Sequence, residues 1–157
     1  MSIRFIRIDD RLIHGQVVTA WIKNHQAKNV LIIDDLVAQD AFLKNVLEMV
    51  KPSGINLIIR GTEELGQTIK TYDESAQNTV VLMKTPKTAK LLYENGITLK
   101  ELNVGGMGAS KERHSVYKNV SASDSEMLTL KEIESLGVRV YFQATPNDKK
   151  IDLNTIK

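Results

Sequence analysis

The alternation of short apolar segments with longer amphipathic segments is the feature that most limits how this chain can fold. The short segments are rich in Ile, Val or Leu and span residues 3–8, 29–33, 56–59, 79–83, 101–104 and 138–142. The amphipathic segments between them have the length and polarity of helices and span residues 16–25, 37–50, 62–72, 88–95 and 124–136. This alternation is typical of a mostly parallel sheet. The sequence therefore predicts an α/β fold: an open, mostly parallel β-sheet with helices on both faces.

Composition favours one globular domain and excludes several classes of protein. The 157 residues, 42% of them hydrophobic, suffice for one core, and no repeat or linker divides residues 1–157. The balance of 21 basic against 19 acidic residues argues against a nucleic-acid binder. The absence of cysteine excludes disulfide scaffolds and thiol catalysis. Because the amino-terminal segment is unlike a targeting sequence and no apolar run approaches the roughly 20 residues needed to cross a bilayer, we expect a soluble, cytoplasmic chain.

The carboxyl-terminal half of the sequence contains local signals for a helix start and for an irregular segment. Ser123 or Asp124 is expected to cap the last long helix, with Glu126 completing a capping box. Residues 105–118 are rich in glycine and charge and are expected to form either a functional loop or a short extra hairpin. A short strand is expected at residues 117–120.

Charged and polar side chains follow the predicted strands at the points where those strands end. They are Asp9, Asp10, Arg11 and His14 after the first strand, Asp34 and Asp35 after the second, Arg60 and Thr62 after the third, Lys84 and Thr85 after the fourth, and Gly105, Gly106 and Gly108 after the fifth. The carboxyl ends of parallel strands meet along one edge of an open sheet, where ligands bind. The basic side chains and glycines at this edge predict an anionic ligand.

The first of these loops has the composition of a phosphate site. His14 stands directly before a predicted helix, so the backbone N–H groups of Gly15, Gln16 and Val17 can face a negative group on its ring. A neutral imidazole is a competent nucleophile toward phosphorus. Arg11 is placed to supply the charge-assisted contact that a phosphoryl group requires.

An acidic residue is expected to complete this site. Asp9 or Asp10 would orient Arg11 or hold the tautomer of the His14 ring. Phosphoryl transfer depends mainly on alignment and on stabilising the charge of the equatorial oxygens. One histidine, one arginine and a helix N-terminus therefore suffice for a phosphate carrier, and the predicted site contains no cofactor and no metal ion.

Two segments carry a resemblance to a known family. Residues 7–17, Arg-Ile-Asp-Asp-Arg-Leu-Ile-His-Gly-Gln-Val, followed by Trp21, resemble the phosphorylation-site segment of the IIB components of the mannose/fructose/sorbose family of the bacterial sugar phosphotransferase system (PTS). Residues 103–107, Asn-Val-Gly-Gly-Met, resemble the family's Asn-x-Gly-Gly-Met segment. Thr85-Pro86 and residues 143–146 are also similar to the family, so the resemblance covers essentially the whole chain.

The resemblance implies a phosphocarrier that acts as a protein-phosphohistidine–sugar phosphotransferase. It implies that His14 accepts phosphate on Nδ1 from the phosphohistidine of a IIA protein or domain and passes it to a sugar bound by membrane IIC and IID components. It implies that Arg11 holds the phosphate and that Arg7 lies near the surface that docks IIA. It also implies a place in the cytoplasm, at the inner face of the membrane through IIC and IID.

Other basic residues are candidates for a docking rim around the same edge. They are Lys84, Lys87, Lys111 and Arg113. The sequence contains no heptad repeat and no evident exposed apolar stripe, and it remains compatible with a homo-oligomer.

Competing interpretations of the acidic residues and of His14 stay open at this point. Asp9-Asp10 and Asp34-Asp35 could hold magnesium, although acids at strand ends also cap helices. A receiver-like signalling domain would share the layout, but it requires an aspartate after the third strand, where this chain has Arg60. A non-catalytic module that binds a small anion would use His14 only as a hydrogen-bond partner.

Overall fold

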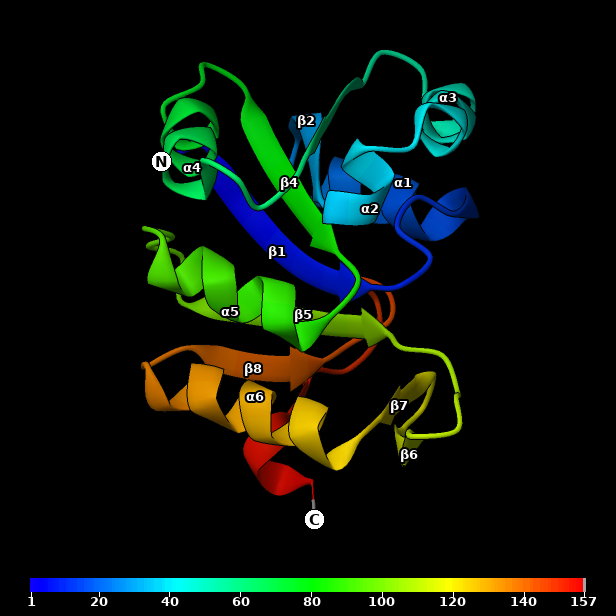
Figure 1. The fold of residues 1–157 in the computed structure, drawn as a ribbon, viewed down its shortest axis with the longest axis vertical. Helices are drawn as coiled ribbons and strands as arrows, with labels where there is room; N and C mark the ends of the chain where they lie inside the picture. The colour runs from blue at the N-terminus through cyan, green and yellow to red at the C-terminus, as the bar shows by residue number, and fades with distance from the viewer. Residues whose placement is uncertain (157) are drawn as a thin grey trace.

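The computed structural model describes residues 1–156 and is built around one seven-stranded sheet (Figure 1). Its strands are β1 (Ile3–Asp9), β2 (Ala27–Ile33), β3 (Asn56–Arg60), β4 (Asn78–Met83), β5 (Glu101–Gly106), β8 (Arg139–Phe142) and β9 (Ile151–Asp152). They lie in the order β3-β2-β4-β1-β5-β8-β9, and only the pairing of β8 with β9 is antiparallel. The predicted open, mostly parallel sheet is therefore confirmed.

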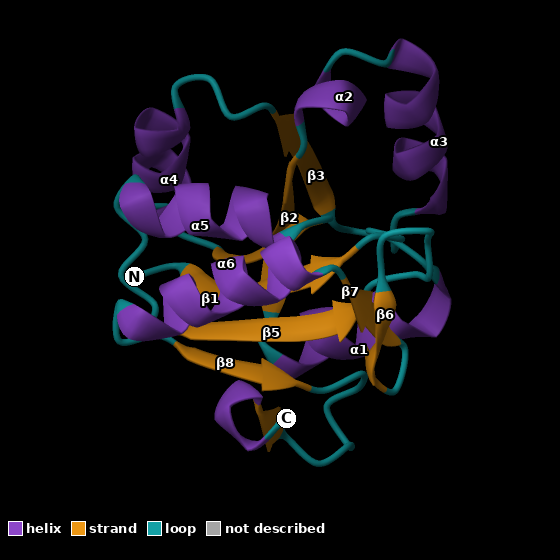
Figure 2. Cartoon of the chain, turned by 60° about the horizontal axis from the view of Figure 1, so that its bottom comes forward, coloured by secondary structure: helices purple, strands orange, loops and turns teal. Residues whose placement is uncertain are grey.

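Helices cover both faces of this sheet, and each face has its own apolar core (Figure 2). One core includes side chains of α1 (Gly15–Asn24), α2 (Asp35–Ala38) and α3 (Ala41–Val50). The other includes side chains of α4 (Leu65–Asp73), α5 (Pro86–Glu94) and α6 (Asp124–Ser135). Because side chains alternate along a strand, Ile6 and Ile8 of β1 enter the second core and Phe5 enters the first. Arg7 and Asp9 therefore point toward the face that α1 covers.

The predicted helix over residues 37–50 is two helices, α2 and α3. The break comes at Asp40, whose carboxylate accepts a hydrogen bond of 3.0 Å from the backbone N–H of Leu43 and so caps α3. No residue of α3 is buried, and the helix exposes Phe42, Val46 and Met49 on one side. This apolar stripe was not evident in the sequence because its spacing equals that of a core-facing helix.

Residues between β5 and α6 form the hairpin β6 (His114–Tyr117) and β7 (Val120–Ala122), which lies beyond the arrowhead of β5 in Figure 1. Of the two alternatives for residues 105–118, the short extra hairpin is confirmed. The strand expected at 117–120 is wrong, because Asn119 has φ of 62° and turns the chain there. The capping box at Ser123 and Glu126 is confirmed.

The topology brings the ends of β1 and β5 together. These strands are neighbours, but β1 continues into α1 on one face of the sheet, whereas β5 continues through β6 and β7 into α6 on the other. Because the chain leaves these two neighbouring strands toward opposite faces of the sheet, a crevice forms at their carboxyl ends. Ligands usually bind in this crevice of an open α/β sheet.

Candidate functional site

The carboxylate of Asp9, the last residue of β1, joins three basic side chains in this crevice. Its Oδ2 lies 3.0 Å from Nη2 of Arg7 and 3.0 Å from Nε2 of His14. Its Oδ1 accepts hydrogen bonds from Nε and from the backbone N–H of Arg11, at 3.2 and 3.1 Å. Asp9 is fully buried. Of the two acids considered in the sequence, Asp9 is thus the one that contacts both Arg11 and His14.

The turn between β1 and α1 holds these side chains in place. The backbone N–H of Leu12 donates to the carbonyl of Asp9 at 2.9 Å, and Leu12 has φ of 56°. The side chains of Leu12 and Ile13 are buried in the core beneath α1. Two apolar side chains therefore anchor the turn from below, and the polar side chains of Arg11 and His14 are left at the surface of the crevice.

The contact between His14 and Asp9 fixes which ring nitrogen carries the proton. An ionised carboxylate only accepts hydrogen bonds, so Nε2 donates and the neutral ring keeps its lone pair on Nδ1. Among the described residues, Nδ1 has no hydrogen-bond partner. The His14 side chain is 23% exposed, so a phosphoryl group can reach it from solvent.

The start of α1 adds backbone donors beside this ring. His14 is the N-cap residue and makes no side-chain capping bond, so the first-turn N–H groups of Gly15, Gln16 and Val17 have no side-chain acceptor. These donors lie where the sequence predicts that an anion binds, and that assignment stays a prediction.

Arg7 supports the site from inside the protein. It is only 2% exposed, its Nη1 donates to Oδ1 of Asn103 at 2.6 Å and to the carbonyl of Gln143 at 3.0 Å, and its guanidinium lies 5.5 Å from the centre of the Trp21 ring. The expected place of Arg7 on a docking surface is therefore wrong. Arg7 is buried because both faces of β1 are covered.

Gly105 is the residue that makes room for this buried arginine. A Cβ at position 105 would lie 1.9 Å from Cζ of Arg7, a separation that no side chain can accept. At the next position, a Cβ on Gly106 would lie 3.0 Å from both the Asp9 carboxylate and the Arg11 guanidinium. Gly105 and Gly106, the last two residues of β5, thus let the backbone approach the loop that carries His14.

The charges of the site are mutually compensated. Burial by itself would raise the pKa of Asp9, but hydrogen bonds from Arg11 and His14, together with the charge of Arg7, outweigh burial and hold this pKa below its usual value. Burial lowers the pKa of Arg7, and Asp9 opposes that effect. The carboxylate is therefore ionised at neutral pH and able to accept from the His14 ring.

The candidates for a docking rim fall into different environments. Lys84 is partly exposed, with its Nζ 4.0 Å from Oδ2 of Asp34. Arg113 is bonded to Asp10 and Glu126, so it is not a free rim cation. A hollow of about 360 Å³ lies beside Asp10 and Arg11 and is walled on its far side by the β6–β7 hairpin.

The structure gives the other acids at this edge structural partners. Asp34 caps α2 by accepting from the backbone N–H of Val37 at 2.9 Å, and Asp35 accepts from the backbone and hydroxyl of Thr62. Within residues 1–156, no group of three or more His, Cys, Asp or Glu side chains gathers as a metal site would require. β3 ends at Arg60, at the position where a receiver would need its phosphate-accepting aspartate.

Sequence reasoning missed the inner supports of the site. Asn103 and Gln143 hold Arg7, and Arg113 joins the loop after β5 to Asp10 and to α6. The Asn-x-Gly-Gly-Met segment and the residues around Gln143 had been singled out as motifs without a role. Their position at the ends of β5, which pairs with β1, and of β8, which pairs with β5, was the available signal.

Comparison with known proteins agrees with this architecture. Residues 3–156 match the model of a family described as "PTS system sorbose subfamily IIB component". The chain is 30% identical over 152 residues to the fructose-specific EIIB component of Bacillus subtilis strain 168, covering 97% of this chain and 93% of that protein. It is 28% identical over 153 residues to the mannose-specific EIIAB component of Escherichia coli K12, covering 98% of this chain and 47% of that longer protein.

A solved structure gives the same result for the fold. The IIBSor domain of the sorbose permease from Klebsiella pneumoniae superposes with a TM-score of 0.91 at 27% identity, covering 98% of this chain and 94% of that chain. None of the helices among residues 1–156 combines the length and apolar character that crossing a bilayer requires. With a family model matched over nearly its whole length, this chain belongs to the sorbose-subfamily IIB components of the sugar phosphotransferase system.

Proposed function

We propose that His14 accepts a phosphoryl group on Nδ1 from the phosphohistidine of a IIA partner and delivers it to a sugar during uptake. The observation that carries this proposal is the 3.0 Å contact between Nε2 of His14 and Asp9, which leaves the lone pair on Nδ1. In the first step the Nδ1–P bond forms while the N–P bond of the donor histidine breaks. The donor ring leaves neutral, and the Asp9 carboxylate stabilises the positive charge that develops on the His14 ring.

Arg11 is the residue that we assign to the phosphoryl oxygens. Its side chain is 53% exposed, and Nε and Nη2 are turned toward Asp9, so its guanidinium is already oriented next to the His14 ring. The backbone N–H groups of Gly15, Gln16 and Val17 face the same group from the start of α1. Arg11 and the first turn of α1 therefore stabilise the negative charge on the equatorial phosphoryl oxygens from two sides.

The partners follow from the family. In the Escherichia coli relative, the region similar to this chain is about half of a protein named as a mannose-specific EIIAB component, which supports a IIA protein or domain as the phosphate donor. In the second step a sugar hydroxyl attacks phosphorus, the Nδ1–P bond breaks with its electron pair returning to the His14 ring, and the hydroxyl proton passes to solvent. We assign the binding of that sugar to membrane IIC and IID components, which would hold this chain at the inner face of the membrane. Lys84, partly exposed near the same edge, is a candidate contact for a partner.

Labelling by a phosphorylated IIA protein tests the proposal. The wild-type chain is expected to gain one phosphate that is labile in acid and stable in base, as a phosphoramidate is and an acyl phosphate is not. His14→Ala is expected to abolish the label. His114→Ala is the matched control, because His114 is exposed at the start of β6 and should leave labelling unchanged.

Two further measurements test the roles that we assign to Nδ1 of His14 and to Arg11. Nitrogen-15 correlation spectra of the phosphorylated ring are expected to place phosphorus on Nδ1. Arg11→Ala is expected to slow labelling by about a hundredfold, the usual loss when one donor to a developing anion is removed. Full labelling of His14→Ala would assign the chemistry elsewhere, and a wild-type chain that takes no label would favour the module that merely binds an anion.

A further inference from the structure

Arg113 lies in the loop between β5 and β6 and connects it to the loop after β1 and to the start of α6. Its Nη1 donates to Oδ2 of Asp10 at 3.4 Å and to the carbonyl of Gly108 at 2.9 Å. Its Nε and Nη2 donate to Oε1 and Oε2 of Glu126, at 2.9 and 2.8 Å. The Arg113 side chain is only 16% exposed, so these contacts are largely sheltered from solvent.

Glu126 provides a fixed point for this arginine. It is the third residue of α6, and its Oε1 accepts from the backbone N–H of Ser123 at 3.0 Å, which closes the capping box. Hydrogen bonds and the charge of Arg113 outweigh burial and hold the pKa of Glu126 below its usual value. One end of the Arg113 guanidinium is therefore attached to the rigid start of a helix.

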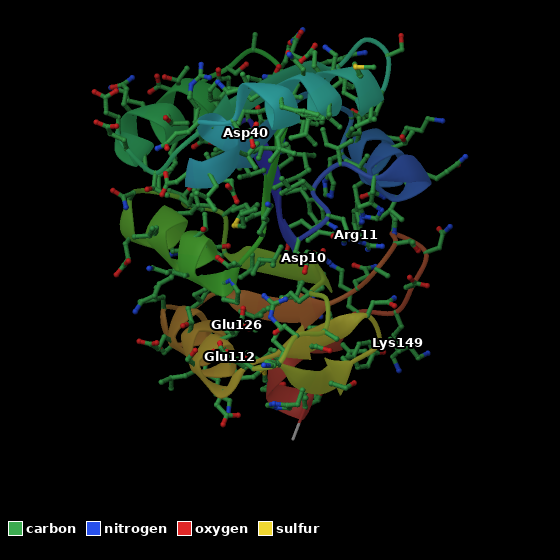
Figure 3. All side chains as sticks on the ribbon, turned by 45° about the vertical axis from the view of Figure 1, so that its right-hand side comes forward. Asp10, Arg11, Asp40, Glu112, Glu126 and Lys149 are labelled. Carbon is green, nitrogen blue, oxygen red and sulfur yellow. The ribbon has the colours of Figure 1, made fainter. Side chains whose placement is uncertain are left out.

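Asp10 is the other attachment point, and it lies between the two site residues Asp9 and Arg11 in the chain. Its Oδ2 accepts from the backbone N–H of Gly108 at 2.7 Å, and its own N–H donates to the carbonyl of Gly106 at 3.0 Å. Figure 3 labels Asp10 and Arg11 after the end of β1 and Glu126 at the start of α6. Arg113 thus acts on Asp10 both directly and through Gly108.

Arg113 is not itself free to hold a phosphoryl group. A guanidinium has five N–H donors, and the four bonds to Asp10, Gly108 and Glu126 use all but one of them. We propose that Arg113 is a positioning residue for phosphoryl transfer, which connects Asp10 to the start of α6 and thereby fixes the turn that carries Arg11 and His14. This inference rests on the proposed function of His14.

The first test separates positioning from docking. Arg113→Ala is expected to lower the limiting rate of labelling by phosphorylated IIA by between about tenfold and about a hundredfold, because small displacements of aligned groups cost this much. The donor concentration that gives half the limiting rate is expected to stay within about twofold of wild type. A higher half-saturating concentration at an unchanged limiting rate would make Arg113 a docking residue and overturn the proposal.

Arg139 offers a matched control. It forms a two-point ion pair with Asp152, at 2.6 and 3.4 Å, which is more exposed than that of Arg113, and it begins β8, so it lies at the opposite ends of the strands from the site. Arg139→Ala is expected to leave the limiting rate unchanged. An equal loss of rate in Arg113→Ala and Arg139→Ala would show a general effect on folding and would also overturn the proposal.

A double-mutant cycle tests whether Arg113 acts through Asp10. In an Asp10→Ala background, Arg113→Ala is expected to change the limiting rate by less than about twofold, because the connection is already broken. An equal loss of limiting rate from Arg113→Ala in the wild-type chain and in the Asp10→Ala chain would contradict the proposal that Arg113 acts through Asp10.

Two milder variants keep the proposal testable if Arg113→Ala does not fold. Glu126→Gln preserves the capping box, since glutamine also serves at that position, but removes the charge that holds Arg113, so a loss in the same direction is expected. Arg113→Lys retains the positive charge, but one ammonium group cannot bond Asp10 and Glu126 as the guanidinium does. A limiting rate between those of wild type and Arg113→Ala is therefore expected. Wild-type rates in both would overturn the proposal. Failure of wild-type labelling, or labelling that survives His14→Ala, would instead refute the function on which it rests.

Discussion

At the scale of single residues, the carboxylate of Asp9 is the group on which the site depends most. Asp9→Asn keeps the shape of the side chain but leaves the buried charge of Arg7 without its counter-charge. Breaking a buried pair in this way costs about 3–5 kcal/mol. We expect this loss in the free energy of unfolding at pH 7, measured by urea denaturation. Asp152→Asn, which breaks a half-exposed pair with Arg139, is the control and should cost less than about 1 kcal/mol.

The same variant should reveal a pH dependence. Because the pKa of Asp9 is lowered in the folded chain, its carboxylate contributes full stability above the ordinary value of 3.8, and the contribution is lost as the pH falls through the lower folded value. The difference between wild type and Asp9→Asn is therefore expected to be constant from pH 7 to about 5 and to narrow only below the ordinary value. A difference that stays constant below pH 3.8 would show that the pKa of Asp9 is the same in the folded and unfolded chain. A difference that shrinks between pH 7 and pH 5 would show that folding raises this pKa.

The sequence can identify a site residue whose role follows from its position in the chain. It cannot identify one whose role depends on which face of the sheet its side chain enters. His14 and Arg11 could be selected as candidates because a histidine at a strand end and helix start, with an arginine three residues before it, is informative without any tertiary contact. The sequence could not distinguish the roles of Asp9 and Asp10. The end of β1 in the folded sheet decides that the Asp9 carboxylate turns inward and that the Asp10 carboxylate reaches Gly108. The burial of Arg7 depends on the covering of both faces of β1, which is a property of the assembled sheet.

At the scale of elements, α3 differs from every other long helix of residues 1–156 because none of its residues is buried. Met49 is 84% exposed, and the partly buried Leu47 packs against the core beside α1. α6, in contrast, buries Leu130 and Ile133 completely. Local opening is easiest where few apolar contacts are lost. We therefore expect the backbone amides of α3 to exchange with deuterium well before those of α6.

Two variants make that exchange experiment decisive. Asp40→Ala removes the cap of α3, which is expected to cost about 1 kcal/mol and to accelerate exchange in α3 alone. Ser123→Ala removes the corresponding cap of α6 and is expected to leave α3 exchange unchanged. Slower exchange in α3 than in α6 would contradict the argument.

The elements that the sequence predicted best are those whose apolar pattern and end signals agree. β1, β2 and β4 are buried apolar runs, and the capping box of α6 fixed its start. The break between α2 and α3 was missed because Asp40 lies within a run that keeps helical spacing on both sides. The hairpin β6–β7 could be predicted only as one of two alternatives, because its strands of four and three residues are too short for a pattern to be counted.

At the scale of the whole molecule, the sheet is most deeply buried at its centre and least at its edges. β4, β1 and β5 lie in the middle, and the site is built at the ends of β1 and β5. One edge is β3, whose residues are at most half-buried, and the other is β9, a strand of two residues followed by the short 3-10 helix η1 (Leu153–Thr155). A very short last strand leaves little free edge for pairing with another sheet.

Leu153 is the side chain that holds this second edge in place. It is buried in the core shared with α6 and β8, although it follows a two-residue strand. Leu153→Ala is expected to lower the free energy of unfolding by about 2–5 kcal/mol, the usual cost of truncating a buried leucine. The neighbouring Asn154 is exposed, so Asn154→Ala is the control and should change stability by less than about 0.5 kcal/mol.

Because the turn that carries His14 is anchored by Leu12 and Ile13 in the other core, Leu153→Ala should leave labelling by phosphorylated IIA within about twofold of wild type at temperatures where the chain stays folded. A loss of labelling in proportion to the loss of stability would mean that the two faces of the sheet do not act independently. Unchanged labelling in a clearly destabilised chain would show that the β9 edge does not contribute to the phosphoryl-transfer geometry.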